Sequence, residues 1–310
     1  MSLVAEAPGF LQVFSNGTVK RFIPQTASSS AEWSNISCTY NSKDVIIHPS
    51  KPITARIFLP THPTSSDSLS QLPLLVYFHG GGFCIGSTTW LGYHVFLGNL
   101  SATAKTIVFS VDYRLAPENK LPIAYEDCYS ALEWLSSSSE PWLRHADLSS
   151  VFLSGDSAGG NIAHQVAIKA IKANILNIRI KGLVPIHPFF GSETRTELEL
   201  ADSSADAVAM NDMFWKLSLP EGCDRDFYGC NFDKGETEWS LFPAVMVFVA
   251  GLDFLKERGV MYVEFLKRKG VKKVSLVEAE GESHVFHVWN PESEATYLLQ
   301  KQITSFIQSL

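Results

Sequence analysis

Short apolar runs alternate along the chain with segments of helical character. The apolar runs are rich in Val, Ile, Leu and Phe, each is about one strand long, and most are continuous rather than alternating with polar residues. Continuous runs are typical of strands that are covered on both faces, as in a mainly parallel sheet. The predicted strands span residues 72–78, 106–113, 150–156, 180–190, 244–251 and 273–279.

Helices are predicted between these strands. The segments suited to crossover helices span residues 125–135, 160–173, 255–269 and 292–309. This alternation of strand and helix predicts a doubly wound α/β fold. No internal repeat or obvious linker divides the 310 residues, which predicts a single α/β domain. The polar, Pro- and Ser-rich residues 61–73 are predicted to form a surface loop.

Two segments do not fit the alternation. Residues 1–40 precede the first predicted strand, and residues 191–242 separate two predicted strands while combining charged residues with Phe214, Trp215 and Trp239. Long excursions from an α/β sheet near its C-terminal edge often cover a site. We therefore predict that both segments contribute to a cap, with an ordinary helical insertion as the alternative for residues 191–242.

Composition and charge exclude two classes of protein. Apolar residues make up 45% of the chain, which excludes global disorder. Lys plus Arg is 25 and Asp plus Glu is 32, so the formal net charge is −7 and a dedicated nucleic-acid partner is not expected.

The basic cluster within residues 267–273 is interpreted as a solvated helix end, with Gly270 as its C-cap.

The cysteines indicate free thiols. There are five, with no C-x-x-C pair and no zinc-ligand spacing: Cys38, Cys84, Cys128, Cys223 and Cys230. No basic segment followed by an apolar run opens the sequence, and no apolar stretch approaches the ~20 residues that span a bilayer. These features predict a cytoplasmic location and no membrane partner.

The sharpest motif is the pentapeptide GDSAG at residues 155–159, which follows a predicted strand and leads into a predicted helix. A strand, a tight turn and a helix are the context that a G-x-S-x-G nucleophile elbow requires. The flanking glycines leave room for a strained turn around Ser157. The N–H of Ala158 would lie at a helix N-terminus, where an anion is favoured.

A second motif, HGGGF at residues 79–83, directly follows the strand predicted at 72–78. Consecutive glycines let the backbone approach a ligand closely and direct N–H groups at one point. That is the geometry of an oxyanion hole. A phosphate-binding loop is disfavoured because the sequence has neither a Walker motif nor a G-x-G-x-x-G that opens a helix. H-G-G-G upstream of G-x-S-x-G is the order found in lipases and esterases.

A serine alcohol needs a base, and the base needs an acid that orients it. Asp253 follows the strand predicted at 244–251, and His284 follows the strand predicted at 273–279. Both positions are at C-terminal strand ends, where the sites of α/β proteins collect. The order Ser157, Asp253, His284 is the chain order of α/β-hydrolase triads.

Other residues compete for these roles. His287 is the alternative base, although it is farther from the strand end. The acids at 278, 280 and 282 are interpreted as solvated loop charges. Asp156 flanks the serine and cannot easily orient a histidine. His164 is expected to be a structural histidine on the elbow helix, and His79 is expected to hold the glycine loop rather than transfer protons.

Two further polar groups lie near the motifs. Asp112 and Arg114 follow the strand predicted at 106–113 and are interpreted as a structural ion pair. Cys84 adjoins the glycine loop and is expected to be a small buried apolar residue.

Seven ordered blocks resemble the hormone-sensitive-lipase-like α/β-hydrolases, and within them the plant class I carboxylesterases. The resemblance runs through most of the chain, in SKDV (42–45), LPLLVYFHGGGFC (72–84), SVDYRLAPE (110–118), LPIAYEDC (121–128), FLSGDSAGGNIAH (152–164), AGLDFLKERG (250–259) and GESHVFH (281–287).

The resemblance implies an α/β-hydrolase fold, with a mainly parallel central sheet, helices on both faces and a helical cap. It implies Ser157 as nucleophile, Asp253 as acid and His284 as base. It also implies that the N–H groups of Gly81, Gly82 and Ala158 form the oxyanion hole. No metal or organic cofactor is implied, and the expected partner is a small-molecule ester.

Some members of this family are not esterases. Gibberellin receptors lack the triad histidine, and hydroxyisoflavanone dehydratases have Thr in place of the nucleophilic serine. This chain has His284 and Ser157, which favours a serine carboxylesterase acting on small, largely apolar esters. A lyase or dehydratase on the same scaffold and a non-catalytic hormone receptor are the alternatives. Asn231-Phe232 stands where many relatives have Asn-Pro; it lies in the expected cap and so bears on the shape of the substrate rather than on the chemistry.

Overall fold

The computed structural model describes residues 1–29, 39–61, 71–173 and 177–310. Cys38, most of the predicted loop at 61–73 and part of the segment predicted to form an N-terminal part of the cap therefore lie outside the described residues.

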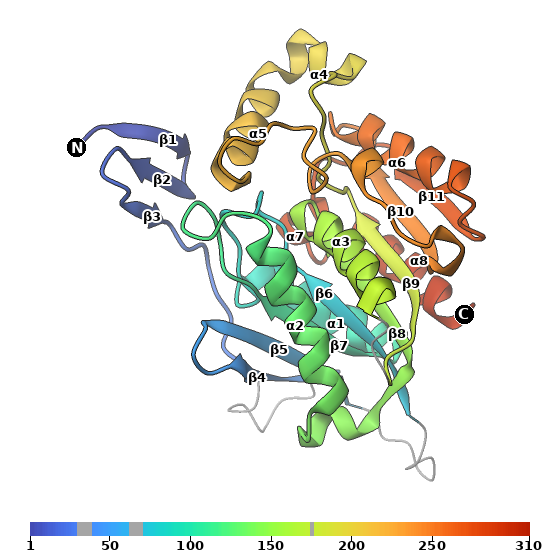
Figure 1. Ribbon diagram of the computed structural model, residues 1–310. Coiled ribbons are helices and arrows are strands. Elements are labelled where there is room, and N and C mark those ends of the chain that lie inside the picture. Colours follow the sequence, from blue (N-terminus) through green and yellow to red (C-terminus); the bar gives the residue numbers. More distant parts are fainter. Residues whose placement is uncertain (30–38, 62–70, 174–176) are drawn as a thin grey trace.

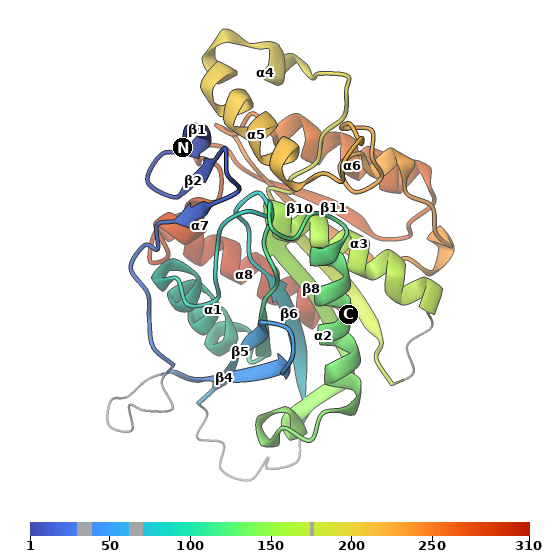
Figure 2. The same cartoon turned by 60° about the vertical axis from the view of Figure 1, so that its left-hand side comes forward.

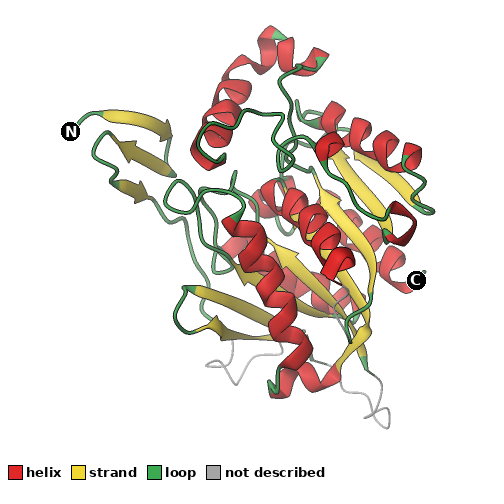
Figure 3. Ribbon diagram, in the orientation of Figure 1, coloured by secondary structure: helices red, strands yellow, loops and turns green. Residues whose placement is uncertain are grey.

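A mainly parallel, eight-stranded sheet forms the centre of the described structure (Figures 1 and 3). Its strand order is β11-β10-β9-β8-β6-β7-β5-β4, and only the pairs β7–β5 and β5–β4 are antiparallel. The strands are β4 (Tyr40–His48), β5 (Ile53–Pro60), β6 (Leu72–Phe78), β7 (Ile107–Asp112), β8 (Ala146–Asp156), β9 (Ile180–Ile186), β10 (Ala244–Ala250) and β11 (Val274–Ala279). All six predicted strands are present and make up the parallel part, which confirms the predicted fold class.

Helices cover both faces of the sheet (Figures 1 and 2). One hydrophobic cluster joins α2, α3 and α6 to the sheet, and a second joins α1, α7 and α8 to its other face. No helix among the described residues is long and apolar enough to cross a bilayer. The helices are α1 (Leu91–Ala104), α2 (Ile123–Ser137), α3 (Ala158–Ala173), α6 (Lys256–Arg268), α7 (Phe286–Trp289) and α8 (Glu294–Gln308), with a 3-10 turn at Pro141–His145.

The central strand β6 shows why apolar runs without alternation build this sheet. Leu74 and Val76 belong to the cluster on one face, whereas Leu75 and Tyr77 belong to the cluster on the other. Every residue of β6 from Leu74 onward is buried because both faces are covered. The sequence pattern of a two-sided strand is therefore continuous rather than alternating.

Three core elements were not predicted. Strands β4 and β5 form the antiparallel edge, and β4 carries polar side chains along much of its length. Helix α1 is apolar on most of its surface and packs its Gly98 against Tyr40, where a Cβ would come within 2.1 Å of the tyrosine ring. Helix α1 therefore lacks the polar face by which a surface helix is recognised.

The N-terminal segment differs from the helical form that the resemblance implied. Its described part is a small antiparallel sheet, separate from the central one, of strands β1 (Leu3–Ala7), β2 (Leu11–Phe14) and β3 (Val19–Arg21). Gly9 and Gly17 occupy the turns with φ of +78° and +83°, a conformation that favours glycine. Tight glycine turns between short, half-buried strands produce a β-meander here, not helices.

Residues 191–242 are largely helical, as expected. They contain α4 (Glu197–Leu200), α5 (Ala205–Ser218) and 3-10 turns at Asp202–Ser204, Phe232–Lys234 and Trp239–Leu241. Trp215 of α5 stacks on Phe189, with ring centroids 4.4 Å apart and planes 5° from parallel. A third hydrophobic cluster joins β1 and β2 to α5 through Leu11 and Phe214. Both segments thus lie on the same side of the molecule (Figure 2).

Candidate active site

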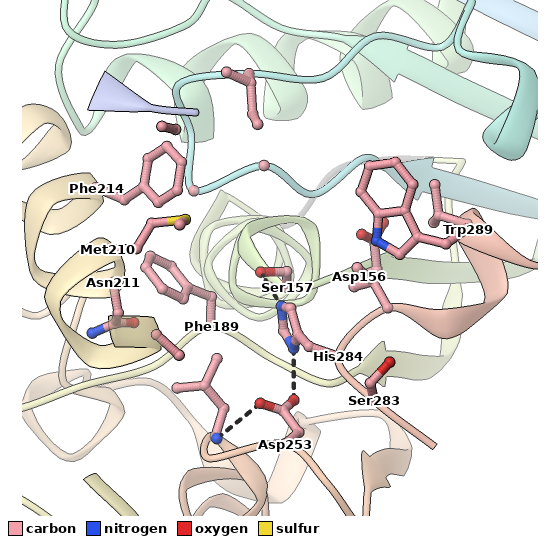
Figure 4. A pocket seen from close by; sticks show the side chains of 18 of the residues that line it. Asp156, Ser157, Phe189, Met210, Asn211, Phe214, Asp253, Ser283, His284 and Trp289 are labelled. Carbon is pink, nitrogen blue, oxygen red and sulfur yellow. Dashed lines mark hydrogen bonds and ion pairs between the residues drawn. The ribbon is translucent and has the colours of Figure 1, made fainter. Parts of the chain in front are cut away.

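A cavity of about 450 Å³ lies at the C-terminal ends of the parallel strands. It is lined by residues that follow β6, β8, β10 and β11, together with residues of the N-terminal meander and of α5. Figure 4 shows Ser157, His284 and Asp253 in one line at this cavity, between the side chains of α5 and Trp289. All three candidate triad residues line it.

Ser157 is held in a strained turn between β8 and α3. Its φ is +51°, a left-handed conformation that is uncommon for residues other than glycine. The turn is fixed by the N–H of Ser157, which donates to the carbonyl of Ile186 at 2.9 Å, and by its carbonyl, which accepts from Phe189 at 2.9 Å. Strain of this kind persists only where the surrounding structure fixes it, which is common at functional sites.

The two glycines of the elbow are required by close backbone packing. A Cβ on Gly155 would come within 2.4 Å of the carbonyl oxygen of Phe78, and a Cβ on Gly159 within 1.8 Å of that same atom. Both contacts involve backbone, which cannot move aside easily. The glycines therefore allow α3 to start directly against the end of β6, which brings the elbow next to the glycine loop.

His284 connects Ser157 to Asp253. Its Nε2 lies 3.0 Å from the Oγ of Ser157, and its Nδ1 lies 2.6 Å from the Oδ2 of Asp253. With Nδ1–H donating to the carboxylate, Nε2 is left as an acceptor for the serine hydroxyl. The second oxygen of Asp253 accepts the N–H of Leu255 at 3.0 Å, which fixes the carboxylate. Figure 4 shows the three hydrogen bonds.

The loops that carry Asp253 and His284 are bonded to each other. The N–H of Gly251 donates to the carbonyl of Ala279 at 2.8 Å, and the N–H of Leu252 donates to the carbonyl of Glu282 at 3.0 Å. These bonds extend the parallel pairing of β10 and β11 beyond the strand ends. The separation of acid and base is therefore set by the sheet itself.

Charge separation between the two groups is favoured. Burial opposes a charge on Asp253, but the adjacent His284 holds the pKa of its carboxyl below the ordinary value. Burial likewise opposes protonation of His284, but the carboxylate of Asp253 and the hydrogen bond between them raise the pKa of the imidazole above its ordinary value. The pair can therefore accept a proton from the serine hydroxyl.

Three backbone N–H groups lie near the serine and make no hydrogen bond to the described residues. They belong to Gly81, Gly82 and Ala158. Gly81 and Gly82 have φ of +105° and +57°, and both line the cavity, whereas Ala158 begins α3. A Cβ on Gly81 would come within 2.2 Å of the carbonyl oxygen of Ile85, so this loop conformation requires glycine there.

Asp156 ties the glycine loop to the elbow. It is buried, and it accepts hydrogen bonds from the Tyr77 hydroxyl at 2.8 Å, the Tyr93 hydroxyl at 2.9 Å and the N–H of Gly80 at 3.0 Å. It makes no hydrogen bond to a histidine ring in the described part of the chain, as expected. Sequence reasoning did not single out Tyr77 or Tyr93. A tyrosine inside the apolar run of β6 was the available signal, since a buried hydroxyl needs a partner.

His79 holds the glycine loop, as predicted. Its Nδ1 donates to the carbonyl of Gly80 at 2.8 Å, and its ring stacks on Tyr113 with centroids 4.4 Å apart. Cys84 is fully buried, and burial raises the pKa of its thiol.

The predicted ion pair between Asp112 and Arg114 is wrong. Arg114 instead pairs with Asp127 of α2 through two hydrogen bonds, at 2.8 Å from Nε and 2.7 Å from Nη2. Asp112 accepts from the N–H and the hydroxyl of Thr88. Residues 112 and 114 share a backbone segment, but the arginine reaches a helix distant in sequence, which the local pattern does not indicate.

The competing histidines do not reach Ser157. His287 is fully buried, packs against Phe96 with the two ring planes tilted by 59°, and has a pKa lowered to about 3 by burial. His164 accepts or donates at Nδ1 to the Tyr262 hydroxyl at 2.9 Å, while its Nε2 has no partner among the described residues. Neither ring makes a hydrogen bond to the serine.

Of the three rival acids, Glu278 and Glu280 are exposed, and Glu278 pairs with Lys256. Glu282 is partly exposed. None of these carboxylates bonds His284, so the carboxylate beside the imidazole is that of Asp253.

One group of possible metal ligands was found among the described residues. It comprises His187, Asp253 and His284, whose ligand atoms lie within 4.8 Å of one another. Asp253 and His284 already bond each other, and the Nδ1 of His187 accepts the N–H of Val285 at 3.0 Å. A metal ion here would have to break these hydrogen bonds, so the donor set fits a proton relay better than a metal centre.

The fold and the geometry of the site agree with the comparisons with known proteins. Residues 75–288 match the family described as the alpha/beta hydrolase fold. The chain belongs to this family.

Within it, the chain is similar to plant carboxylesterases. It is 37% identical to "Probable carboxylesterase 6" of Arabidopsis thaliana, over 98% of this chain and 91% of that protein. It is 35% identical to "Tuliposide A-converting enzyme 1, chloroplastic" of Tulipa gesneriana, over 99% of this chain and 78% of that protein. Among solved structures, it is similar to the Pyrobaculum calidifontis esterase, with a TM-score of 0.75, 29% identity and coverage of 87% of this chain and 85% of that one.

Proposed function

We propose that this protein is a serine carboxylesterase. Ser157 is the nucleophile, His284 the general base and Asp253 the residue that orients His284. As the Oγ of Ser157 attacks an ester carbonyl, its proton passes to the Nε2 of His284 over the 3.0 Å contact. The carboxylate of Asp253 stabilises the imidazolium that forms. The alcohol leaves with this proton, and the acyl group stays on Ser157.

Water completes the cycle. His284, neutral again, removes a proton from a water molecule that attacks the acyl-enzyme, and it returns the proton to Ser157 as the carboxylic acid leaves. In both halves, the N–H groups of Gly81, Gly82 and Ala158 donate to the oxygen on which negative charge develops. These three N–H groups have no hydrogen-bond partner among the described residues, so they are available to donate to that oxygen.

The cavity favours small, largely apolar esters. Apart from the residues of the catalytic site, its lining is mostly aromatic and aliphatic, with Phe10, Phe189, Phe214, Leu252 and Trp289 among the contributors. We propose that residues 1–40 and 191–242 act as the cap over this cavity. In support, Ala7 and Phe10 of the first segment and Phe214 of the second line it.

The relay from Asp253 through His284 to Ser157 is the observation that carries the proposal. The test is the hydrolysis of p-nitrophenyl butyrate by the wild type and Ser157→Ala. The wild type is expected to turn over, and the variant to lose at least roughly 10³-fold in kcat. Ser149→Ala, an exposed serine, is the matched control. Equal rates for wild type and Ser157→Ala would overturn the proposal.

A second candidate is a lyase on the same scaffold. The name of the tulip relative describes a conversion of tuliposide A rather than a hydrolysis, and that protein matches 99% of this chain. Product masses distinguish the two: hydrolysis in ¹⁸O-labelled water places one label in the released acid, whereas elimination places none. A cytoplasmic location stays a prediction, because the name of the tulip relative assigns that protein to the chloroplast.

A further inference from the structure

The buried face of helix α5 carries two polar side-chain atoms without a hydrogen-bond partner in the described structure, and one of the two belongs to a residue that lines the cavity. The buried residues of α5 are Val208, Asn211, Trp215 and Ser218, spaced three or four apart. Val208 is apolar, and Ser218 donates its hydroxyl to a carbonyl of its own helix at 2.8 Å. The Nε1 of Trp215 has no partner in the described structure, but Trp215 is not among the residues that line the cavity. Asn211 is 5% exposed, and its Oδ1 has no hydrogen-bond partner in the described structure. A buried polar atom without a partner costs about 1–3 kcal/mol, so native proteins seldom leave one without a reason.

Asn211 is one of the residues that line the cavity containing Ser157. Figure 4 shows Asn211, Met210 and Phe214 on the α5 side of the cavity, with Trp289 on the opposite side and Ser157 between them. An ester bonded to Ser157 would therefore extend in one direction towards α5. The neighbours of Asn211 on that side, Met210, Phe214 and Phe189, are apolar. A single amide in an apolar arm can recognise a single polar group.

The position of Asn211 is fixed before a ligand arrives. The adjacent residue, Asp212, accepts a hydrogen bond from Arg225 at 2.8 Å and also pairs with Arg195. On the next turn, Trp215 stacks on Phe189. These contacts hold α5 from both sides of Asn211, so binding would require little ordering of the helix.

The charges of the lining indicate an uncharged ligand. Its charged residues are Asp156 and Asp253, and both are committed to other partners, Asp156 to two tyrosines and Asp253 to His284. No Lys or Arg lines the cavity in the described part of the chain. A carboxylate or phosphate on the substrate would therefore meet negative charge without a compensating cation.

We propose that Asn211 is a specificity-determining residue that hydrogen-bonds a hydroxyl group on an uncharged ester. A hydroxyl can donate to the amide Oδ1 and accept from the amide Nδ2. The preferred substrate class is thus a hydroxy-substituted ester, with its hydroxyl in the arm that extends towards α5. This inference rests on the proposed hydrolysis at Ser157.

The test compares two pairs of esters of matched shape. On the acyl side, the pair is p-nitrophenyl β-hydroxybutyrate and p-nitrophenyl isovalerate. On the alcohol side, it is hydroxypropyl butyrate and n-butyl butyrate. For each pair, the ratio of kcat/KM for the hydroxylated ester to that for the apolar ester is measured in the wild type, Asn211→Leu and Asn211→Ser. Lys216→Leu, at an exposed position of the same helix, is the matched control.

In at least one pair, both Asn211 variants are expected to lower the ratio about tenfold, as loss of one hydrogen bond in a desolvated site implies. If Asn211→Leu does not fold, the kcat/KM ratios of Asn211→Ser test the role of Asn211. A change of less than about threefold in both pairs would overturn the role of Asn211 while leaving ester hydrolysis intact. If the wild type hydrolyses neither pair, or Ser157→Ala hydrolyses both as fast, the proposed function fails and this inference with it.

Discussion

The carboxylate of Asp156 accepts the N–H of Gly80 at 3.0 Å, which joins the residue before the candidate nucleophile to the loop that carries the candidate oxyanion donors. The Tyr93 hydroxyl strengthens this link, because it accepts from the same N–H at 2.9 Å and donates to Asp156 at 2.9 Å. The distance between serine and glycine loop is therefore set by a buried carboxylate, although Asp156 has no place in the proton relay.

Replacing that carboxylate should impair catalysis. In Asp156→Asn, the amide N–H₂ is a donor and would face the hydroxyl and N–H donors that bond the carboxylate in the wild type. Because two donors cannot bond each other, the glycine loop should shift. Loss of a single oxyanion donor lowers kcat by 10²–10³, so we expect a fall of roughly 10- to 100-fold in kcat with a smaller change in KM. Steady-state kinetics with p-nitrophenyl butyrate measure this. A kcat equal to that of the wild type would show that Asp156 does not position the loop.

Acid pH should inactivate the enzyme through His284. The base must be neutral to accept a proton, and Asp253 raises the pKa of His284 above 6.5 despite burial. We therefore expect kcat/KM to fall as pH decreases, with an apparent pKa above 6.5. In Asp253→Asn the raising effect is removed while burial remains, so the midpoint should move to lower pH and the rate should fall by roughly 10⁴.

Profiles of kcat/KM from pH 5 to 9 for both proteins test this expectation. A flat profile for the wild type between pH 5 and 8 would contradict the assignment of His284 as base. A midpoint unmoved in Asp253→Asn would contradict the coupling between the two residues.

The elbow glycines should be essential for folding. In Gly159→Ala the new Cβ would meet the carbonyl oxygen of Phe78 at 1.8 Å, and backbone must move to relieve the overlap. We expect a loss of roughly 4 kcal/mol or more of unfolding free energy, or no folded protein. Gly281→Ala is the control, because nothing lies within 4 Å of a Cβ there. Urea unfolding followed by circular dichroism compares the variants, and equal midpoints would contradict the packing described.

Buried histidines should limit stability in acid. Burial lowers the pKa of His164 to about 3, whereas in the unfolded chain this ring titrates near 6.5. As the pH falls, the unfolded state binds this proton before the folded state does. The free energy of unfolding therefore has its full value above pH 6.5 and decreases as the pH falls towards 3. Between pH 7 and pH 5, one such ring lowers the free energy of unfolding by about 2 kcal/mol. His164→Phe should reduce the difference between the unfolding free energies at pH 7 and pH 5 by about that amount, and an unchanged difference would contradict it.

The parallel strands could be predicted from sequence because each is buried on both faces and so has a continuous apolar run. The edge strand β4 could not, since its polar side chains break such a run. Helix α1 was not predicted for a different reason: it is apolar on most of its surface and so lacks the polar face that marks a surface helix. The meander had a usable signal in Gly9 and Gly17, which flank the half-buried LQVF segment.

For the candidate site, motif spacing identified the three residues that the structure brings into contact, Ser157, Asp253 and His284. Spacing could not reveal how they are supported. Tyr93 lies on the unpredicted α1, and Asn211 lies on α5, so their distances from Ser157 depend on tertiary packing. The pairing of Arg114 with Asp127 is likewise a long-range contact without a local sequence signal.

The most direct test of the central claim is covalent labelling of the nucleophile. The wild type is incubated with a p-nitrophenyl phosphonate, and its intact mass, peptide map and residual esterase activity are followed together. If Ser157 is the nucleophile, one phosphonyl group should attach per chain, on the peptide that contains Ser157, with activity lost in proportion, and Ser157→Ala should carry no adduct. An adduct on another residue, or full inactivation without modification of Ser157, would contradict it.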